Sequence, residues 1–260
     1  MFASSAPDKF LPSYGVWSEP KLTRAASPRI TLSESTAVGI FIGQSNFANA
    51  VNATLAATNA AKIDCFNVVD GGTYPGTEPL LGCSPGNLGN MALHVADQCI
   101  SAGIWQRFIM VPIALSGTTF AQWGSGQWAP ILPNAIRRLA SVGLTPTLIM
   151  QQHGESDNIA GTSQADCQLY MGQMIAQARA LGVNAPWLIA KCSYIAGATN
   201  ANVRNAQAAM VNPAAQIYAG PDTDTLTGTA VNRQGDDTHF TLTGAAAAGG
   251  LWKNSIDLVF

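Results

Sequence analysis

The stretch Ala37-Val38-Gly39-Ile40-Phe41-Ile42-Gly43-Gln44-Ser45-Asn46 decides the fold. Its first six residues form a short apolar run, which predicts a strand, and the longer run Arg107–Leu115 is typical of a strand that is covered on both faces of a sheet. Gly43 and the polar residues after it predict a tight turn at the end of that strand. Ligands of open parallel sheets bind just beyond the carboxyl ends of the strands, so we expect the chemistry at this turn.

Further apolar runs alternate with helical segments along the rest of the chain. The predicted strands after the first are Asp64–Val69, Arg107–Leu115, Thr147–Gln151, Trp187–Lys191 and Gln216–Ala219, with a loop over Gly71–Asn87. The predicted helices are Phe47–Ala61, Leu88–Ala102, Pro130–Val142, Ser163–Leu181, Asn200–Met210 and Thr241–Ile256. This alternation predicts an α/β protein with a mainly parallel sheet of five or six strands.

The first 36 residues differ from the remainder. They carry Pro7, Pro12, Pro20 and Pro28 among serines and threonines without a sustained period, which predicts an irregular N-terminal arm. No internal repeat and no break in composition follows, so residues 37–260 are predicted to form a single domain.

Composition excludes several classes of protein. Only 11% of the residues are charged, against roughly 25% in an average globular domain, and 47% are hydrophobic, which argues against disorder. The net charge of −2 gives no basic excess, so we expect no nucleic-acid partner and no anionic membrane partner. The longest apolar runs, such as Phe108–Leu115, fall far short of the roughly 18 residues of a membrane span.

Low charge together with abundant Ala, Gly, Thr and Asn favours an extracellular or exported protein, although Met1–Pro12 lacks the pattern of a secretory signal. The five cysteines contain no CxxC pair and no zinc-finger spacing, so we expect no metal. A Cys65–Cys83 bridge is compatible with an oxidising compartment and is left open by the sequence. The oligomeric state is also left open.

Ser45 follows directly on a predicted strand. A serine on a tight strand-to-helix turn presents its hydroxyl at the edge of the sheet, where the first backbone N–H groups of the next helix also point. Such a serine can act as a nucleophile, but it can also be a simple helix N-cap.

A second candidate segment is Asp236-Asp237-Thr238-His239, before the last predicted helix. A serine nucleophile needs an imidazole to take its proton and a carboxylate to hold that imidazole, and one loop can deliver both when Asp lies three residues before His. The alternative is a polar turn that caps the last helix. The chain has only three histidines, and His94 lies within a predicted helix, where we expect a structural role.

A third segment, Gln151–Asp157, is a dense polar cluster directly after a predicted strand. Such a cluster at the end of a strand indicates that something polar binds there. The alternative is a solvated turn.

Together these motifs resemble those of the SGNH-type hydrolases, in particular the branch with sialate O-acetylesterases and acetylxylan esterases. The matching segments are Gly43–Asn46, Leu115–Trp123, His153–Asp157 and Asp236–Phe240, in the order of the family. One such motif is weak evidence, whereas four in order are strong. The resemblance runs from about Ala37 to the C-terminus and implies a three-layer α/β/α sandwich of the flavodoxin-like kind.

The resemblance also implies roles for individual residues. Ser45 becomes the nucleophile, His239 the general base and Asp236 its orienting carboxylate, while Asp237 falls at a variable position. The backbone N–H groups of Ser45 and Gly117 become donors to the oxyanion.

The chain departs from the family at two positions. Ser116 stands where a second glycine is common, and His153 stands where the branch usually has glutamine. We expect His153 to donate a hydrogen bond to the oxyanion as that glutamine would. Gln44, Glu155 and Trp123 are expected to contact the substrate, with Trp123 stacking on a sugar face unless it packs in the core.

The sequence therefore predicts a serine esterase that removes acetyl groups from a carbohydrate through an acyl-enzyme, with no cofactor. One alternative is a short-chain lipid or thioester hydrolase on the same fold. Another is a carbohydrate-binding or virion module without turnover, against which the complete set of Ser45, Asp236 and His239 argues.

Overall fold

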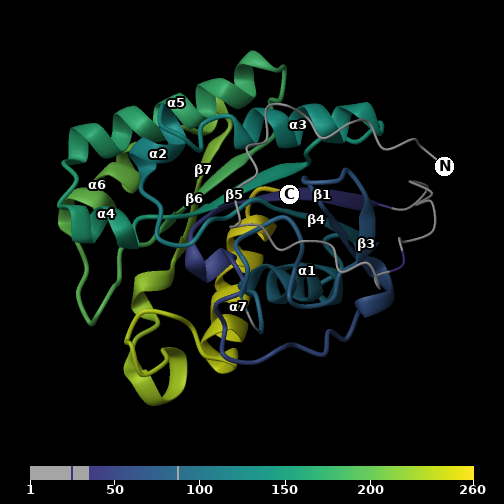
Figure 1. Ribbon diagram of the computed structural model, residues 1–260, viewed down its shortest axis with the longest axis horizontal. Coiled ribbons are helices and arrows are strands. Elements are labelled where there is room, and N and C mark those ends of the chain that lie inside the picture. The colour runs from purple at the N-terminus through teal and green to yellow at the C-terminus, as the bar shows by residue number, and fades with distance from the viewer. Residues whose placement is uncertain (1–24, 26–34, 87) are drawn as a thin grey trace.

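A seven-stranded sheet forms the centre of the molecule (Figure 1). The structure is a computed structural model, and it describes residue 25 and residues 35–86 and 88–260. The strands lie in the order β3-β2-β4-β1-β5-β6-β7, and all pair in parallel except β3, which is antiparallel to β2. Their bounds are β1 (Thr36–Gly43), β2 (Ile63–Phe66), β3 (Thr73–Pro75), β4 (Arg107–Pro112), β5 (Leu148–Gln152), β6 (Trp187–Lys191) and β7 (Ile217–Asp222).

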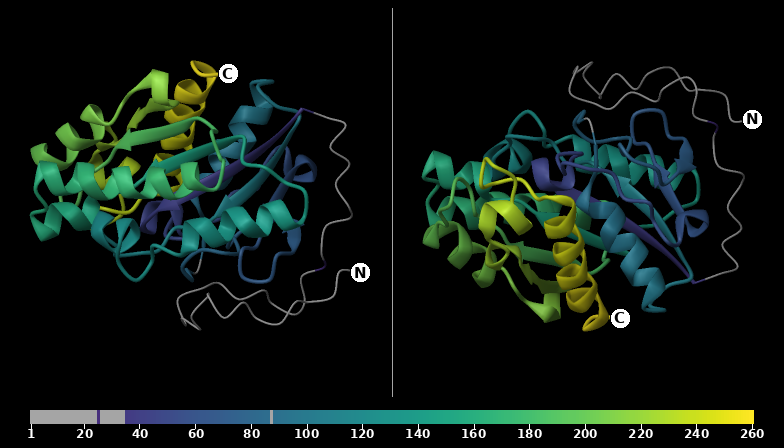
Figure 2. Two further views of the ribbon diagram at one scale, coloured as in Figure 1. Left: turned by 90° about the horizontal axis from the view of Figure 1, so that it is seen from above. Right: turned by 90° about the horizontal axis from the view of Figure 1, so that it is seen from below.

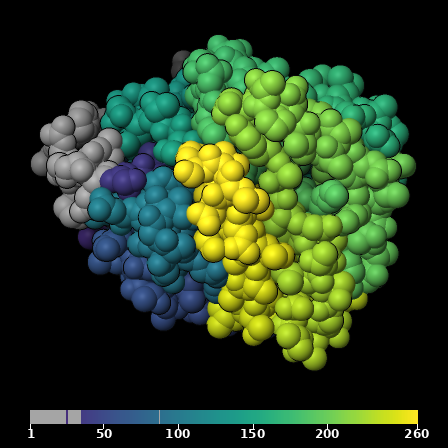
Figure 3. All heavy atoms as spheres, turned by 180° about the vertical axis from the view of Figure 1, so that it is seen from behind, coloured from purple at the N-terminus to yellow at the C-terminus, as the bar shows by residue number. Residues whose placement is uncertain are grey.

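Helices cover both faces of this sheet, which makes a three-layer sandwich (Figures 1 and 2). One face carries α1 (Met91–Ser101) and α7 (Leu242–Asp257), which pack against each other. In Figure 3, seen from behind, α7 forms a yellow ridge between blue and green parts of the chain. The other layer contains α2 (Phe120–Gly124), α3 (Ile131–Ser141), α4 (Glu155–Ala160), α5 (Gln164–Ala180) and α6 (Ala201–Ala209).

The alternation of side chains along β1 divides the core in two. Ala37 and Phe41 pack into the cluster that contains residues of α1 and α7, while Val38, Ile40 and Ile42 pack into the cluster under α3 and α5. Both sets are buried, so β1 has no solvent-facing side. This explains the continuous apolar run in its sequence.

The predicted fold class is confirmed, whereas several predicted elements need correction. The short helices α2 and α4 form in segments for which no helix was predicted, and β4 ends at Pro112 and not at Leu115. The sheet has seven strands because β3 pairs as an antiparallel edge strand inside the segment predicted to be a loop. The predicted helix Phe47–Ala61 is wrong: only the three-residue 3₁₀ turns Ser45–Phe47 and Ala60–Lys62 form there. Asn49 in this segment uses its side chain to hold both the N–H and the C=O of Leu80, and such side-chain-to-backbone bonds compete with a helix.

Other sequence-based expectations meet the structure only in part. The proposed arm lies almost entirely outside the described residues. The five cysteines are all buried and free, so no Cys65–Cys83 bridge is formed. Within residues 35–86 and 88–260, no helix is long and apolar enough to cross a membrane.

Candidate active site

The end of β1 brings Ser45 to the carboxyl edge of the sheet. A Cβ on Gly43 would lie 2.1 Å from the carbonyl oxygen of Gln152 in β5, so only glycine lets the chain leave the strand here. Ser45 then opens a single 3₁₀ turn and is 6% exposed. Its hydroxyl makes no hydrogen bond with the described part of the chain, which leaves the oxygen available for reaction.

The loop before α7 joins Asp236 to His239. Asp236 Oδ2 lies 2.5 Å from His239 Nδ1, and Asp236 Oδ1 accepts the backbone N–H groups of Thr238 and His239, both at 3.0 Å. Partial burial acts to raise the pKa of Asp236, but these hydrogen bonds outweigh it and hold the pKa below its ordinary value. Asp236 is therefore a charged acceptor that orients the imidazole, whose side chain is 31% exposed.

Asn46 connects the serine turn to the histidine loop. Its Oδ1 accepts the N–H of Phe240 at 3.1 Å, and its Nδ2 lies 3.4 Å from the carbonyl oxygen of Thr238. These two backbone groups flank His239, and Asn46 itself follows Ser45 in the chain. The side chain of Asn46 thus holds the imidazole loop next to the serine. No hydrogen bond joins Ser45 to His239 in the described chain, and such contacts often tighten only when substrate binds.

Two buried charged residues support Asn46 and its loop. Glu155 Oε1 accepts Asn46 Nδ2 at 2.9 Å, and Arg233 Nη1 donates to the carbonyl oxygen of Thr238 at 2.6 Å. Glu155 and Arg233 are each 1% exposed, and burial raises the pKa of the glutamate. This corrects the expectation that Glu155 contacts substrate: a side chain without access to solvent holds Asn46 instead.

The turn at Gly117 lies beside the serine turn because the chain after β4 continues to follow β1. Leu115 donates its N–H to the carbonyl of Gly43 at 3.0 Å. Leu115 lies two residues before Gly117, and Gly43 lies two residues before Ser45, so this bond brings the two turns together. Gly117 is exposed and has φ +71°, a left-handed conformation that favours glycine. The backbone N–H groups of Ser45 and Gly117 meet no acceptor within the described residues, so both are free to bind an anion.

The side chains of Ser84 and Asp157 fix the turn at Gly117. Ser84 Oγ accepts the N–H of Ser116 at 2.9 Å, and Asp157 Oδ2 accepts the N–H of Phe120 at 2.9 Å. Burial raises the pKa of Asp157 to about 6, against the lowering effect of the Phe120 N–H and the Thr162 hydroxyl. The turn is therefore held from both ends without use of the N–H of Gly117.

His153 does not have the role that the sequence predicted. Its Nε2 lies 2.7 Å from the carbonyl oxygen of Thr118, and a carbonyl only accepts, so Nε2 carries the proton. Burial lowers the pKa of His153 to about 4, so the ring is neutral near pH 7 and has only this one N–H. Its Nδ1 is buried and meets no donor among the described residues. His153 therefore holds the Gly117 turn from beneath and has no hydrogen left for an oxyanion.

The buried state of His153 predicts a pH-dependent stability difference. Its pKa is about 4 in the folded protein and 6.5 ordinarily, so its contribution is present above pH 6.5 and is lost as the pH falls toward 4. For His153→Gln, whose amide can still donate to Thr118, the free energy of unfolding should rise relative to wild type by roughly 2–3 kcal/mol between pH 7.5 and 4.5. Urea titrations of both proteins across this range measure the difference. Parallel pH curves would mean that folding does not lower the pKa of His153.

Two more residues expected at the substrate are buried. Gln44 is 2% exposed, and its Oε1 accepts the N–H of Ser156 at 3.2 Å, which joins the first motif to the third. Trp123 is 1% exposed, and its Nε1 donates to Thr118 Oγ1 at 2.9 Å. Trp123 therefore packs under the Gly117 turn and offers no face to a sugar.

Sequence reasoning missed two residues that hold the site together, Asn46 and Arg233. Asn46 belongs to the motif Gly43–Asn46 and directly follows the candidate nucleophile, so the sequence offered a signal for a role at the site. Arg233 belongs to no recognisable motif, because its partners are the backbone carbonyls of Thr223, Leu226 and Thr238, and any residue type can supply a carbonyl. Within the described chain, no group of three or more His, Cys, Asp or Glu side chains could hold a metal ion.

Comparison with known proteins adds the fold family. No family model matches the chain, and no curated protein does. Among solved structures, a protein from Arabidopsis thaliana is similar with a TM-score of 0.68 at 17% identity, covering 87% of this chain and 98% of that one. A carbohydrate acetylesterase from Xanthomonas citri has a TM-score of 0.62 at 14% identity over 86% of this chain and 56% of that one. NanS has a TM-score of 0.57 at 16% identity over 88% and 98%.

The fold is that of the SGNH hydrolases. The SGNH fold also accounts for the order of the four motifs along the chain. They end up on loops after β1, β4, β5 and β7, at one edge of the sheet. At identities of 14–17% the similarity shows the fold alone, and the chemistry follows from the residues of the site.

Proposed function

We propose that the protein is a serine esterase that removes O-acetyl groups from a carbohydrate. The observation that carries the proposal is the pair of hydrogen bonds by which Asn46 donates to the carbonyl of Thr238 and accepts the N–H of Phe240, which holds the Asp236–His239 pair next to Ser45. A carboxylate, an imidazole and a serine in this relation form the constellation of acyl-transfer enzymes.

In the acylation step, His239 Nε2 takes the proton of the Ser45 hydroxyl while Oγ attacks the ester carbonyl. Asp236 accepts the Nδ1–H of His239 and stabilises the imidazolium that forms. The oxygen of the tetrahedral intermediate is bound by the free N–H groups of Ser45 and Gly117. Collapse of the intermediate breaks the ester C–O bond, and His239 gives its proton to the leaving sugar oxygen, which departs as a hydroxyl.

In the deacylation step, a water molecule gives a proton to His239 Nε2 and attacks the acetyl-enzyme. The second tetrahedral intermediate releases acetic acid, which ionises to acetate in solution, and the proton on His239 restores the Ser45 hydroxyl. Every proton and bond in this cycle is accounted for by the ester, the water and these three side chains. A metal or organic cofactor has no step to perform in it.

The substrate class is supported by two observations. The carbohydrate acetylesterase from Xanthomonas citri shares the fold over most of this chain. The turn beside Ser45, at Ser116 and Gly117, is exposed and polar, which suits a hydrated sugar ester better than a long acyl chain. The alternative function is that of a lipid or thioester hydrolase, and the preference for acyl-chain length distinguishes the two.

The substrate class predicts a preference for the shortest acyl group. We expect kcat/KM to be at least about tenfold higher for p-nitrophenyl acetate than for the octanoate, since a longer chain finds no apolar partner at the polar turn. The panel should include acetylated xylan and O-acetylated sialic acid with acetate release as the readout, and Ser45→Ala as the blank. A higher kcat/KM for the octanoate would favour the lipid hydrolase.

A further inference from the structure

The segment after β6 lies against the loop that carries Asp236 and His239. The hydroxyl of Tyr194 lies 3.0 Å from both carboxylate oxygens of Asp237, and the N–H of Ala196 donates to Thr238 Oγ1 at 3.0 Å. Asp237 and Thr238 are the two residues between Asp236 and His239. The segment therefore contacts the middle of the turn that presents the imidazole.

Asp237 has an unusual backbone conformation. Its φ is +49°, in the left-handed region that few residues other than glycine adopt, although aspartate and asparagine do so more readily than most. This conformation turns the side chain of Asp237 away from His239, so that Asp236 faces the imidazole and Asp237 faces Tyr194. The Tyr194–Asp237 contact thus stabilises the backbone conformation that separates the two aspartates.

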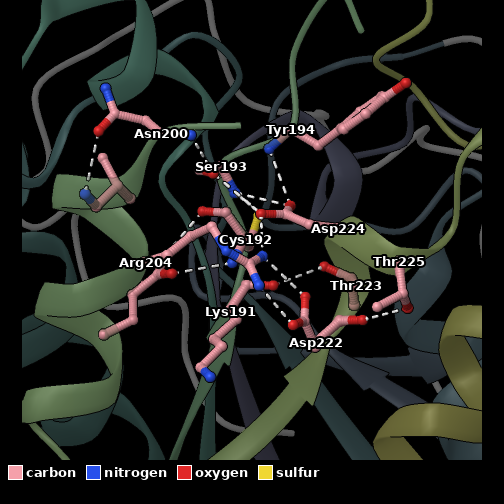
Figure 4. Close-up of polar contacts among 12 residues, drawn as sticks. Lys191, Cys192, Ser193, Tyr194, Asn200, Arg204, Asp222, Thr223, Asp224 and Thr225 are labelled. Atoms are coloured by element: carbon pink, nitrogen blue, oxygen red, sulfur yellow. Dashed lines mark hydrogen bonds and ion pairs between the residues drawn. The ribbon is translucent and has the colours of Figure 1, made fainter. Parts of the chain in front are cut away.

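Tyr194 is itself anchored by a buried carboxylate (Figure 4). Asp224 Oδ1 accepts the backbone N–H groups of Ser193 and Tyr194 at 2.8 and 2.9 Å, and Asp224 Oδ2 accepts the Ser193 hydroxyl at 3.0 Å. Arg204 Nη1 donates to Asp224 Oδ2 at 2.6 Å. These bonds fix the backbone at Tyr194, three residues after the end of β6.

The ring of Tyr194 is fixed as well. The guanidinium carbon of Arg233 lies 4.9 Å from the centre of the Tyr194 ring and 3.9 Å from that of Phe240, within range of cation–π contact. Tyr194 is 7% exposed. The contacts that hold the Tyr194 ring and backbone do not involve Asp237. The hydroxyl of Tyr194 is therefore fixed independently of Asp237, as a positioning group requires.

We propose that Tyr194 is a positioning residue for the catalytic base: through Asp237 it sets the place of His239 relative to Ser45. This inference rests on the proposed function, because it concerns the same base. A base displaced by a fraction of an ångström costs rate in the chemical step and leaves substrate binding unchanged. A merely structural tyrosine would lower the melting temperature and leave kcat of the folded protein as it was.

The experiment compares Tyr194→Phe with Tyr74→Phe. Tyr74 also donates its hydroxyl to an aspartate, Asp70, at 2.8 Å, but it lies on the edge strand β3, outside the candidate site. Both changes remove one tyrosine–aspartate hydrogen bond and keep the ring. With p-nitrophenyl acetate we expect Tyr194→Phe to lower kcat by about 10- to 100-fold with KM unchanged, and Tyr74→Phe to leave both unchanged.

Changes at Asp237 test the contact from its other side. Asp237→Gly keeps the backbone freedom and removes the acceptor, so it should match the loss in Tyr194→Phe, and the double variant should lose no more than either single variant. Asp237→Asn keeps an acceptor oxygen and should retain wild-type kcat. Additive losses in the double variant would show that the two residues act separately, and an unchanged kcat in both single variants would overturn the proposal.

A readout without turnover separates this inference from the proposed function. His239 Nδ1 lies 2.5 Å from Asp236 Oδ2, so we expect the proton between them to give a downfield proton resonance that is absent in His239→Ala. We expect Tyr194→Phe to broaden or shift this resonance and Tyr74→Phe to leave it in place. If the wild-type protein shows no Ser45-dependent hydrolysis, the proposed function is wrong, but the resonance still reports on the position of His239. If the resonance is unperturbed in Tyr194→Phe, the positioning role of Tyr194 is contradicted and the proposed function is not.

Discussion

Replacing Ser45 with alanine should lower kcat for ester hydrolysis by about 10⁵- to 10⁶-fold, the loss typical of a serine nucleophile that acts together with a base. The Ser45 hydroxyl makes no hydrogen bond in the described chain, so its removal leaves no buried partner unsatisfied. The free energy of unfolding should therefore change by less than about 1 kcal/mol. Burst and steady-state kinetics with p-nitrophenyl acetate, together with urea unfolding, measure both quantities.

Ser116→Ala is the matched control for Ser45→Ala. Ser116 is exposed on the neighbouring turn and offers another hydroxyl at the same edge of the sheet. We expect Ser116→Ala to retain activity within a few-fold of wild type. A Ser45→Ala protein with a tenth of wild-type kcat would exclude Ser45 as the nucleophile.

The second large effect concerns Asp236→Asn, which should lower kcat by about 10⁴-fold. The oxygen Oδ1 of Asp236 accepts two backbone N–H groups, so the amide oxygen of an asparagine must take that place. The amide NH₂ then faces His239 Nδ1 and can only donate to it. The imidazole would carry its proton on Nε2, where it cannot take a proton from Ser45. Stopped-flow measurement of acylation tests this directly.

Asp237→Asn is the matched control, because it makes the same chemical change one residue further along. Asn retains an acceptor for Tyr194 and tolerates the φ of +49°. Its kcat should lie within a few-fold of wild type. If Asp237→Asn were the more damaging of the two changes, the assignment of Asp236 to His239 would be wrong.

The parts of the molecule that depend on local pattern were predictable from the sequence. The apolar run Arg107–Leu115 predicted a strand covered on both faces, and β4 has this arrangement: Phe108 and Met110 pack into one core, Ile109 and Val111 into the other. The spacing of Asp236 and His239 predicted that one loop carries both, and the two side chains are in contact. The helices α1, α3, α5, α6 and α7 lie within one to three residues of the predicted bounds.

What failed depended on partners that are distant in the chain. Glu155 was expected at the substrate, but it is buried and accepts a hydrogen bond from Asn46, which lies 109 positions away in the chain. His153 was assigned by analogy with a glutamine, and the carbonyl of Thr118 that takes its N–H belongs to another loop. A local pattern reports which residues can form hydrogen bonds, but the burial and the actual partner are set by tertiary packing.

The most direct test of the central claim, that His239 activates Ser45 as a nucleophile, is labelling with a fluorophosphonate followed by peptide mass spectrometry. This probe reports on the activated serine without any assumption about the natural substrate. We predict a single adduct on Ser45 in wild type, abolished in Ser45→Ala and slowed by several orders of magnitude in His239→Ala. An adduct on another serine, or equal labelling of Ser45 with and without His239, would contradict the account.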